Sequence, residues 1–141
     1  MKKLVASIIV LLVVVLGGVS LYMPQNSQKD MVGMAEAKNA SFQIIDYKKA
    51  KMMMDKGGVT IVDVRRQDEY DAGHIKGAIL VPNESIKNTD PKALPDKNAV
   101  LLVYCRTGIR AKDASQKLAN LGYKNVYDFG GITDWPYEKV K

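Results

Sequence analysis

Five short apolar runs recur along the chain after residue 40 and alternate with polar, helix-forming stretches. The runs are rich in β-branched residues and nearly continuous in hydrophobicity, which is typical of strands buried on both faces of a sheet. Their alternation with helices predicts an α/β fold, in which helices cover both faces of a mostly parallel central sheet. The runs cover residues 42–45, 59–64, 78–81, 100–105 and 125–129.

The polar stretches between these runs carry start and stop signals for helices. Asp46 is a suitable N-cap for a helix that ends at the glycine pair 57–58. A second helix is predicted over residues 111–121, and a short one is predicted to begin near Asn83, whose side chain is also a suitable cap. A polar segment that contains Glu69 and Tyr70 leads to Gly73-His74-Ile75.

The chain begins with positive charge followed by a long apolar run. Lys2 and Lys3 precede an uncharged, mostly apolar stretch over residues 4–23. This stretch is about as long as the roughly 20 residues that span a bilayer. It predicts an N-terminal signal peptide or membrane anchor over residues 1–23. An uncleaved anchor is slightly favoured, because residues 18–20 make a mediocre cleavage site.

The rest of the chain divides into a tether and a body. Residues 24–40 are small and polar and predict a linker, which leaves residues 41–141 as one folded domain. The lysines ahead of the apolar run place this domain outside the cytoplasm, in the periplasm or at the cell surface. If the N-terminal segment is not removed, the membrane is a partner of the chain through it.

Composition narrows the classes of function. Lys and Arg number 21 against 15 Asp and Glu, a formal net charge of +6, but the lysines are scattered and few aromatic residues lie between them. That pattern indicates a mildly basic solvated surface and argues against a nucleic-acid partner. Cys105 is the single cysteine and His74 the single histidine. We therefore expect no internal disulfide and no metal site built from such residues, and we expect no cofactor.

The candidate chemistry centres on Cys105, which ends an apolar run and precedes the predicted helix 111–121. Arg106 and Arg110 flank the short loop, and Gly108 allows positive φ angles that help backbone N–H groups to form an anion-binding nest. A helix N-terminus and two guanidinium groups favour thiolate over thiol. We interpret Cys105 as a reactive nucleophile presented to solvent or ligand. The alternative is a buried, inert thiol, which is common for a lone cysteine.

Three motifs in the body resemble those of the rhodanese-like domain family, and they stand in the family's order. The resemblance covers residues 42–140 and implies a single rhodanese-like domain. The motifs are Asp63-Val64-Arg65 with Glu69-Tyr70 and Gly73-His74-Ile75-Lys76-Gly77-Ala78; Tyr104-Cys105-Arg106-Thr107-Gly108-Ile109-Arg110; and Leu121-Gly122-Tyr123 with Val126-Tyr127 and Gly130-Gly131-Ile132-Thr133-Asp134-Trp135.

The resemblance implies a thiosulfate sulfurtransferase. Cys105 would take a sulfane sulfur from a small-molecule donor such as thiosulfate, become a persulfide, and pass the sulfur to cyanide or a thiol. Backbone N–H groups would stabilise the anionic sulfur and the departing sulfite, and the two arginines would orient the donor's oxygens. The residues expected to bind the substrate are Arg106, Thr107, Gly108, Ile109, Arg110 and Ala111.

Supporting roles are expected for polar residues beside the predicted strand 59–64. Asp63 and Arg65 are expected to form an ion pair that organises the end of this strand, on the same side of the molecule as Cys105. A hydrogen bond that anchors the local loop is expected for His74. Trp135 is expected in the core or at a helix docking contact.

Other functions stay open at this point. A persulfide carrier or a protein-binding module would need no turnover, and the presence of Cys105 argues only against an inactive module. Phosphatases and arsenate reductases resemble this fold but space cysteine and arginine as Cys-x5-Arg, and Arg110 stands one position too early for that spacing. A thiol redox protein is disfavoured because the chain has no second cysteine to resolve a mixed disulfide.

Overall fold

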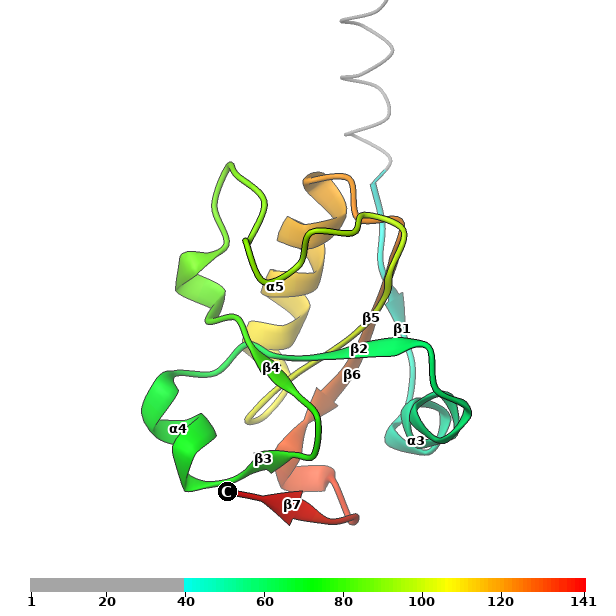
Figure 1. Ribbon diagram of the computed structural model, residues 1–141, viewed down its shortest axis with the longest axis vertical. Helices are drawn as coiled ribbons and strands as arrows, with labels where there is room; N and C mark the ends of the chain where they lie inside the picture. The colour runs from blue at the N-terminus through cyan, green and yellow to red at the C-terminus, as the bar shows by residue number, and fades with distance from the viewer. Residues whose placement is uncertain (1–39) are drawn as a thin grey trace, which may run out of the picture. The chain divides into compact units, whose positions relative to one another are not determined.

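A five-stranded sheet organises residues 40–141, the part of the chain that the computed structural model describes (Figure 1). Its strand order is β1-β6-β5-β2-β4, and every pairing within it is parallel. The five apolar runs supply these strands, so the predicted α/β fold with a mostly parallel central sheet is confirmed. The strands are β1 (Gln43–Ile44), β2 (Val59–Asp63), β4 (Ile79–Leu80), β5 (Val100–Cys105) and β6 (Asn125–Gly131).

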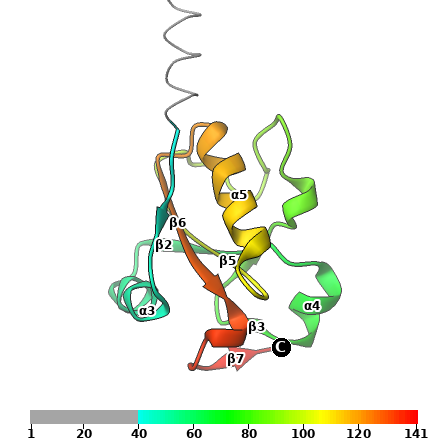
Figure 2. The ribbon, with the colours of Figure 1, turned by 180° about the vertical axis from the view of Figure 1, so that it is seen from behind.

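Helices cover both faces of this sheet. Successive side chains of β5 alternate between the faces: Cys105 packs on the side of α5 (Ile109–Asn120), whereas Leu102 and Tyr104 pack on the side of α3 (Tyr47–Lys56). The two helices lie on opposite sides of the strands in both views of the ribbon (Figures 1 and 2). Cys105 therefore belongs to the layer between the sheet and α5.

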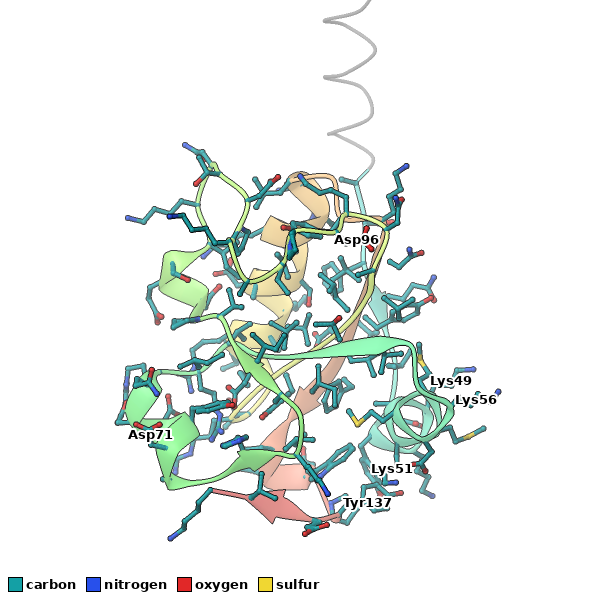
Figure 3. The ribbon with its side chains drawn as sticks, viewed as in Figure 1. Lys49, Lys51, Lys56, Asp71, Asp96 and Tyr137 are labelled. Atoms are coloured by element: carbon teal, nitrogen blue, oxygen red, sulfur yellow. The ribbon has the colours of Figure 1, made fainter. Side chains whose placement is uncertain are left out.

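Helix α3 begins and ends where the sequence predicts. The Asp46 carboxylate accepts a hydrogen bond of 2.7 Å from the Lys49 backbone N–H, and the helix stops at Gly57, whose φ of 79° is left-handed. Ala50 is the fully buried contact of α3 with the sheet. Lys49 and Lys56 point away from the sheet, which matches the predicted solvated basic surface (Figure 3).

No helix was predicted for the polar segment that contains Glu69 and Tyr70, but helix α4 (Gln67–Ala72) forms there. The Arg66 backbone N–H donates a hydrogen bond of 3.1 Å to Glu69, which closes the first turn of α4. None of the six residues of α4 is fully buried, so the sequence shows no apolar periodicity that would indicate a helix.

Asn83 does not cap a helix as predicted. It is the first residue of a short 3-10 turn, η1 (Asn83–Ser85), and its side-chain amide donates a hydrogen bond of 2.9 Å to Asp113 on α5. Lys117, also on α5, donates to the Asn83 side-chain oxygen at 3.2 Å. The side chain of Asn83 is therefore used to fasten η1 to α5.

A small second sheet was not predicted. Strand β3 (His74–Ile75) pairs antiparallel with β7 (Lys139–Val140) close to the C-terminus. The chain reaches β7 through a second 3-10 turn, η2 (Ile132–Asp134), and then Trp135, which is 5% exposed. The expected core position of Trp135 is confirmed.

The predicted signal or anchor over residues 1–23 and nearly all of the predicted linker over residues 24–40 lie outside the described residues. Within residues 40–141, none of the helices has both the length and the apolar character needed to cross a bilayer.

Candidate functional site

The site is built where two neighbouring parallel strands end. Cys105 is the last residue of β5, and Asp63 is the last residue of β2. The pairing of β2 with β5 places Asp63 beside Tyr104, and the Val64 N–H continues the ladder with a bond of 3.0 Å to the Tyr104 carbonyl. The expected meeting of the Cys105 and Asp63 segments at one edge of the sheet is therefore confirmed.

The Cys105 side chain is completely buried, with 0% of its surface exposed. Of the expected presentation to solvent or ligand, the structure contradicts only the exposure of the thiol to solvent. Helix α5 begins at Ile109 rather than at residue 111, so its first turn follows the loop directly. The side chain of Ala111 in that turn is buried in the same apolar cluster as Cys105.

The loop turns a backbone N–H group onto the sulfur. The Gly108 N–H donates a hydrogen bond of 2.9 Å to Cys105 Sγ. Gly108 has a φ of 107°, a left-handed conformation that side-chain-bearing residues rarely adopt, and it is the N-cap of α5. This geometry matches the anion-binding turn expected at Gly108.

The N-terminus of α5 offers further donors beside the same loop. Helical hydrogen bonding begins with the Lys112 N–H, which donates to the Gly108 carbonyl at 3.1 Å. The N–H groups of Ile109, Arg110 and Ala111 precede it and have no intrahelical acceptor. Together with the helix dipole, such free N–H groups stabilise a negative charge at this end of the helix.

The loop backbone is held in place from β6 and η2. Thr133 donates two hydrogen bonds to the Arg106 carbonyl, one from its N–H at 3.2 Å and one from its hydroxyl at 3.0 Å. Gly131 lies so close that a Cβ atom there would be 2.2 Å from the same carbonyl oxygen. The third sequence motif contains both residues, but their contact with the loop could not be predicted from the sequence.

The two loop arginines have different surroundings. The Arg106 side chain is exposed, and Thr107 and Ile109 are exposed beside it. Arg110 is 26% exposed and forms a two-pronged ion pair with Glu69, with nitrogen–oxygen distances of 2.7 and 2.8 Å. Glu69 belongs to the first sequence motif, but no role was predicted for it. In the structure it is the ion-pair partner of Arg110.

The Glu69–Arg110 pair has clear electrostatic consequences. The hydrogen bond from Arg110 lowers the pKa of Glu69 from its ordinary 4.5 to about 2. In return the hydrogen bond to Glu69 raises the pKa of Arg110. Glu69 is therefore a permanent anion at neutral pH, and its side chain is only 13% exposed.

Asp63 and Arg65 form the expected ion pair, at 2.7 Å, and both side chains are buried. The Tyr104 hydroxyl donates to Asp63 at 2.7 Å and accepts a bond of 3.0 Å from the Ile75 N–H. Arg65 also donates to the Gly73 carbonyl at 2.7 Å. These hydrogen bonds join the ends of β2 and β5 to β3. They also give both the Asp63 carboxylate and the Arg65 guanidinium a buried partner.

His74 anchors its own segment, as predicted. Its Nδ1 lies 2.9 Å from the Tyr70 carbonyl oxygen, and its ring stacks on the Tyr70 ring with 3.7 Å between centroids. Among residues 40–141, no group of three or more His, Cys, Asp or Glu side chains is placed to hold a metal ion.

Several known proteins are similar to this chain in sequence or in fold. Residues 46–137 match the family described as Rhodanese-like domain. The thiosulfate sulfurtransferase PspE of Escherichia coli (strain K12) is 38% identical over 80 residues, which are 57% of this chain and 77% of that protein. A solved structure, a rhodanese with anions from E. coli, is 36% identical with a TM-score of 0.53 and covers 58% of this chain and 96% of its own.

Larger proteins contain the same kind of domain. A tRNA uridine(34) hydroxylase of Hamiltonella defensa subsp. Acyrthosiphon pisum (strain 5AT) is 40% identical over 79 residues. The matched part is 52% of this chain but only 22% of the hydroxylase. The similarity therefore concerns one domain of that protein.

Proposed function

Because the chain belongs to the rhodanese-like domain family, we propose that it is a sulfurtransferase in which Cys105 carries the transferred sulfur. The observation that carries the proposal is the bond from the Gly108 N–H to Cys105 Sγ at the N-terminus of α5. A sulfur atom held against N–H groups and a helix dipole is stabilised as an anion. Both the thiolate and the persulfide of the reaction are such anions.

The proposed reaction has two steps. In the first, the Cys105 thiolate attacks the sulfane sulfur of thiosulfate, the sulfur–sulfur bond of the donor breaks, and sulfite leaves with the bonding electrons. In the second, cyanide or a thiolate attacks the outer sulfur of the persulfide, and the Cys105 thiolate is released with the electrons of that bond. Each step exchanges one nucleophile for another at sulfur, so no cofactor or redox partner is required.

The residues around the sulfur suit these steps. The unbonded N–H groups of Ile109, Arg110 and Ala111 can stabilise the persulfide, which extends one atom beyond the thiolate. Arg106 is exposed and can orient the oxygen atoms of the donor through charge-assisted hydrogen bonds. Thr107, exposed next to it, can donate a further bond. Asp63 and Arg65 support the strand end without contacting the substrate.

A second candidate function is a persulfide carrier that delivers sulfur to one partner protein without free turnover. The complete burial of Cys105 favours this reading, because a buried sulfur is shielded from solvent oxidants and small acceptors. The hydroxylase activity of the larger relatives is not proposed for this chain, which spans 22% of the first of them.

The site of action that we propose is outside the cytoplasm. This proposal rests on Lys2 and Lys3 ahead of the apolar stretch 4–23. The segment would act as an export signal or as a membrane anchor for the domain.

Intact-mass spectrometry tests the proposed function directly. After incubation of the full chain with thiosulfate, we expect the mass to increase by that of one sulfur atom, and we expect no increase in a Cys105→Ser variant. Addition of cyanide should return the original mass and release thiocyanate. A persulfide that forms but resists cyanide and small thiols would favour the carrier, and a mass that never changes would contradict both candidates.

A further inference from the structure

The two arginines of the loop differ in their availability to a substrate. The Arg106 side chain is exposed and makes no hydrogen bond or ion pair with the other side chains of residues 40–141. Arg110 uses both terminal nitrogens of its guanidinium fork on Glu69, at 2.7 and 2.8 Å. A donor anion therefore meets one free guanidinium and one that already has a carboxylate partner.

Glu69 is fixed in this position by more than Arg110. Its side chain is 13% exposed, and its carboxylate also accepts the Arg66 N–H at 3.1 Å at the first turn of α4. The carboxylate stays ionised far below neutral pH, since Arg110 holds its pKa at about 2. The Arg66 guanidinium also lies 3.9 Å from the Glu69 carboxylate, but its closer pair with Asp68, at 3.2 Å, cancels its charge.

Three charged side chains lie at or beside the loop that follows Cys105. Arg106 and Arg110 contribute two positive charges and Glu69 one negative charge, so the three side chains leave one positive charge. Thiosulfate carries two negative charges, whereas a thiosulfonate or the anion of a small hydropersulfide carries one. A second anionic charge on the donor would face Glu69 without a free cation to balance it.

We propose that Glu69 is a specificity-determining residue, which occupies Arg110 and thereby favours sulfur donors with one negative charge over dianionic donors. The inference rests on the proposed sulfur transfer and identifies the substrate class of that reaction. Both classes react alike at Cys105: thiosulfate releases sulfite, a dianion, and methanethiosulfonate releases methanesulfinate, a monoanion. The two donors thus differ in charge while the bond that forms at sulfur is the same.

A purely structural role for Glu69 is the competing explanation, because the same ion pair fastens α4 to α5. Loss of a structural contact would impair both donors together, through kcat or through stability. Loss of a charge selector would instead change the ratio between donors, mainly through KM. The ratio therefore separates the two roles.

The first part of the test is kinetic and compares thiosulfate with methanethiosulfonate in the full chain. In Glu69→Gln we expect the kcat/KM for thiosulfate to rise about threefold relative to that for methanethiosulfonate, which is the effect of one partly exposed charge. Asp71→Asn removes a carboxylate from the same helix that bonds to Gln67 and contacts neither Arg66 nor Arg110, and it should leave the ratio unchanged. Glu69→Asp keeps the charge and should restore a ratio close to that of the parent protein.

The second part needs no sulfur transfer. Alkylation of Cys105 by iodoacetate, an anion, is compared with alkylation by iodoacetamide, which is neutral; each forms a carbon–sulfur bond and releases iodide. A changed thiol reactivity cancels in the ratio of the two rates. We expect this ratio to rise about threefold in Glu69→Gln and to stay constant in Asp71→Asn.

The outcomes distinguish the two proposals. Turnover with unchanged donor and alkylation ratios in Glu69→Gln would overturn the role of Glu69 and leave the sulfurtransferase intact. A raised alkylation ratio without turnover of either donor would support the charge selection and overturn the enzymatic function. A Cys105 that no donor loads and neither reagent alkylates would overturn both.

Discussion

At the scale of single residues, the position of Cys105 depends on a close approach of two backbones. Gly131 at the end of β6 has an ordinary extended conformation, with a φ of −125°, so its need for glycine is one of space. A Cβ atom there would lie 2.2 Å from the Arg106 carbonyl oxygen. The loop that holds the sulfur and β6 could not keep their present spacing with any larger residue.

Gly131→Ala is therefore expected to displace the loop. We expect sulfur transfer to fall by about tenfold to a hundredfold, and stability by about 1–3 kcal/mol. Gly130→Ala is the matched control, because Gly130 has a φ of 92° but no atom within 4 Å of an added Cβ. It should lower stability through backbone strain while activity falls much less; equal losses of activity in both variants would contradict this role of Gly131.

Residues of the site differ in how far the sequence predicts them. Cys105, Asp63 and Arg65 were placed correctly at one sheet edge, because the ends of neighbouring parallel strands always meet there. The partner of Arg110 could not be predicted, since Glu69 is 41 residues away and reaches it only through the orientation of α4. The burial of Cys105 was missed because its apolar cluster includes side chains from distant segments, such as Val64 and Val81.

At the scale of elements, the Glu69–Arg110 pair joins α4 to α5 and makes stability depend on pH. The pKa of Glu69 is about 2 in the folded protein and 4.5 ordinarily, so the folded state binds this proton more weakly than the unfolded state. The stabilisation is complete above about pH 4.5 and is lost as the pH falls towards 2.

Urea unfolding at neutral pH and at several points below pH 4.5 measures this contribution. We expect the free energy of unfolding of the parent protein to fall more steeply with acid than that of Glu69→Gln. Parallel acid curves for the two proteins would show that the ion pair does not contribute to stability.

The Tyr104 hydroxyl, at the end of β5, joins this strand to β2 through Asp63 and to β3 through Ile75. In Tyr104→Phe, the Asp63 carboxylate loses a donor and the Ile75 N–H loses its acceptor, both in the buried interior. We expect a loss of about 1–3 kcal/mol of stability. Tyr47→Phe serves as the control, since the Tyr47 hydroxyl has no hydrogen bond within the described part of the chain. A similar loss of stability in both variants would contradict the importance of this network.

At the scale of the whole described domain, residues 40–141, the order of elements was largely predictable and the small additions were not. The inner strands β2, β5 and β6 were recognised because parallel strands that are covered on both faces form nearly unbroken apolar runs. The edge strands β1 and β4 are only two residues long and partly exposed, and they were recognised from short apolar runs alone. β3 and β7 are two residues long, and their pairing depends on the fold that brings the C-terminus to them. Helix α4 has no fully buried residue and so left no apolar pattern in the sequence.

This architecture predicts an order of local stability. β5 is paired on both sides, with β2 and β6, and five of its six residues are fully buried. Amide hydrogen exchange should therefore be slowest in β5 and fastest, among the strands, in the β3–β7 pair. Exchange in β7 as slow as in β5 would contradict the central place of β5 in the domain.

The measurement that tests the central claim most directly is thiocyanate formation from thiosulfate and cyanide by the full chain, beside its Cys105→Ser variant. Serine replaces only the sulfur atom by oxygen, and its hydroxyl cannot form a persulfide. Steady turnover in the parent protein that is abolished in Cys105→Ser is the expected result. Turnover that persists in Cys105→Ser would contradict the proposal that Cys105 carries the sulfur.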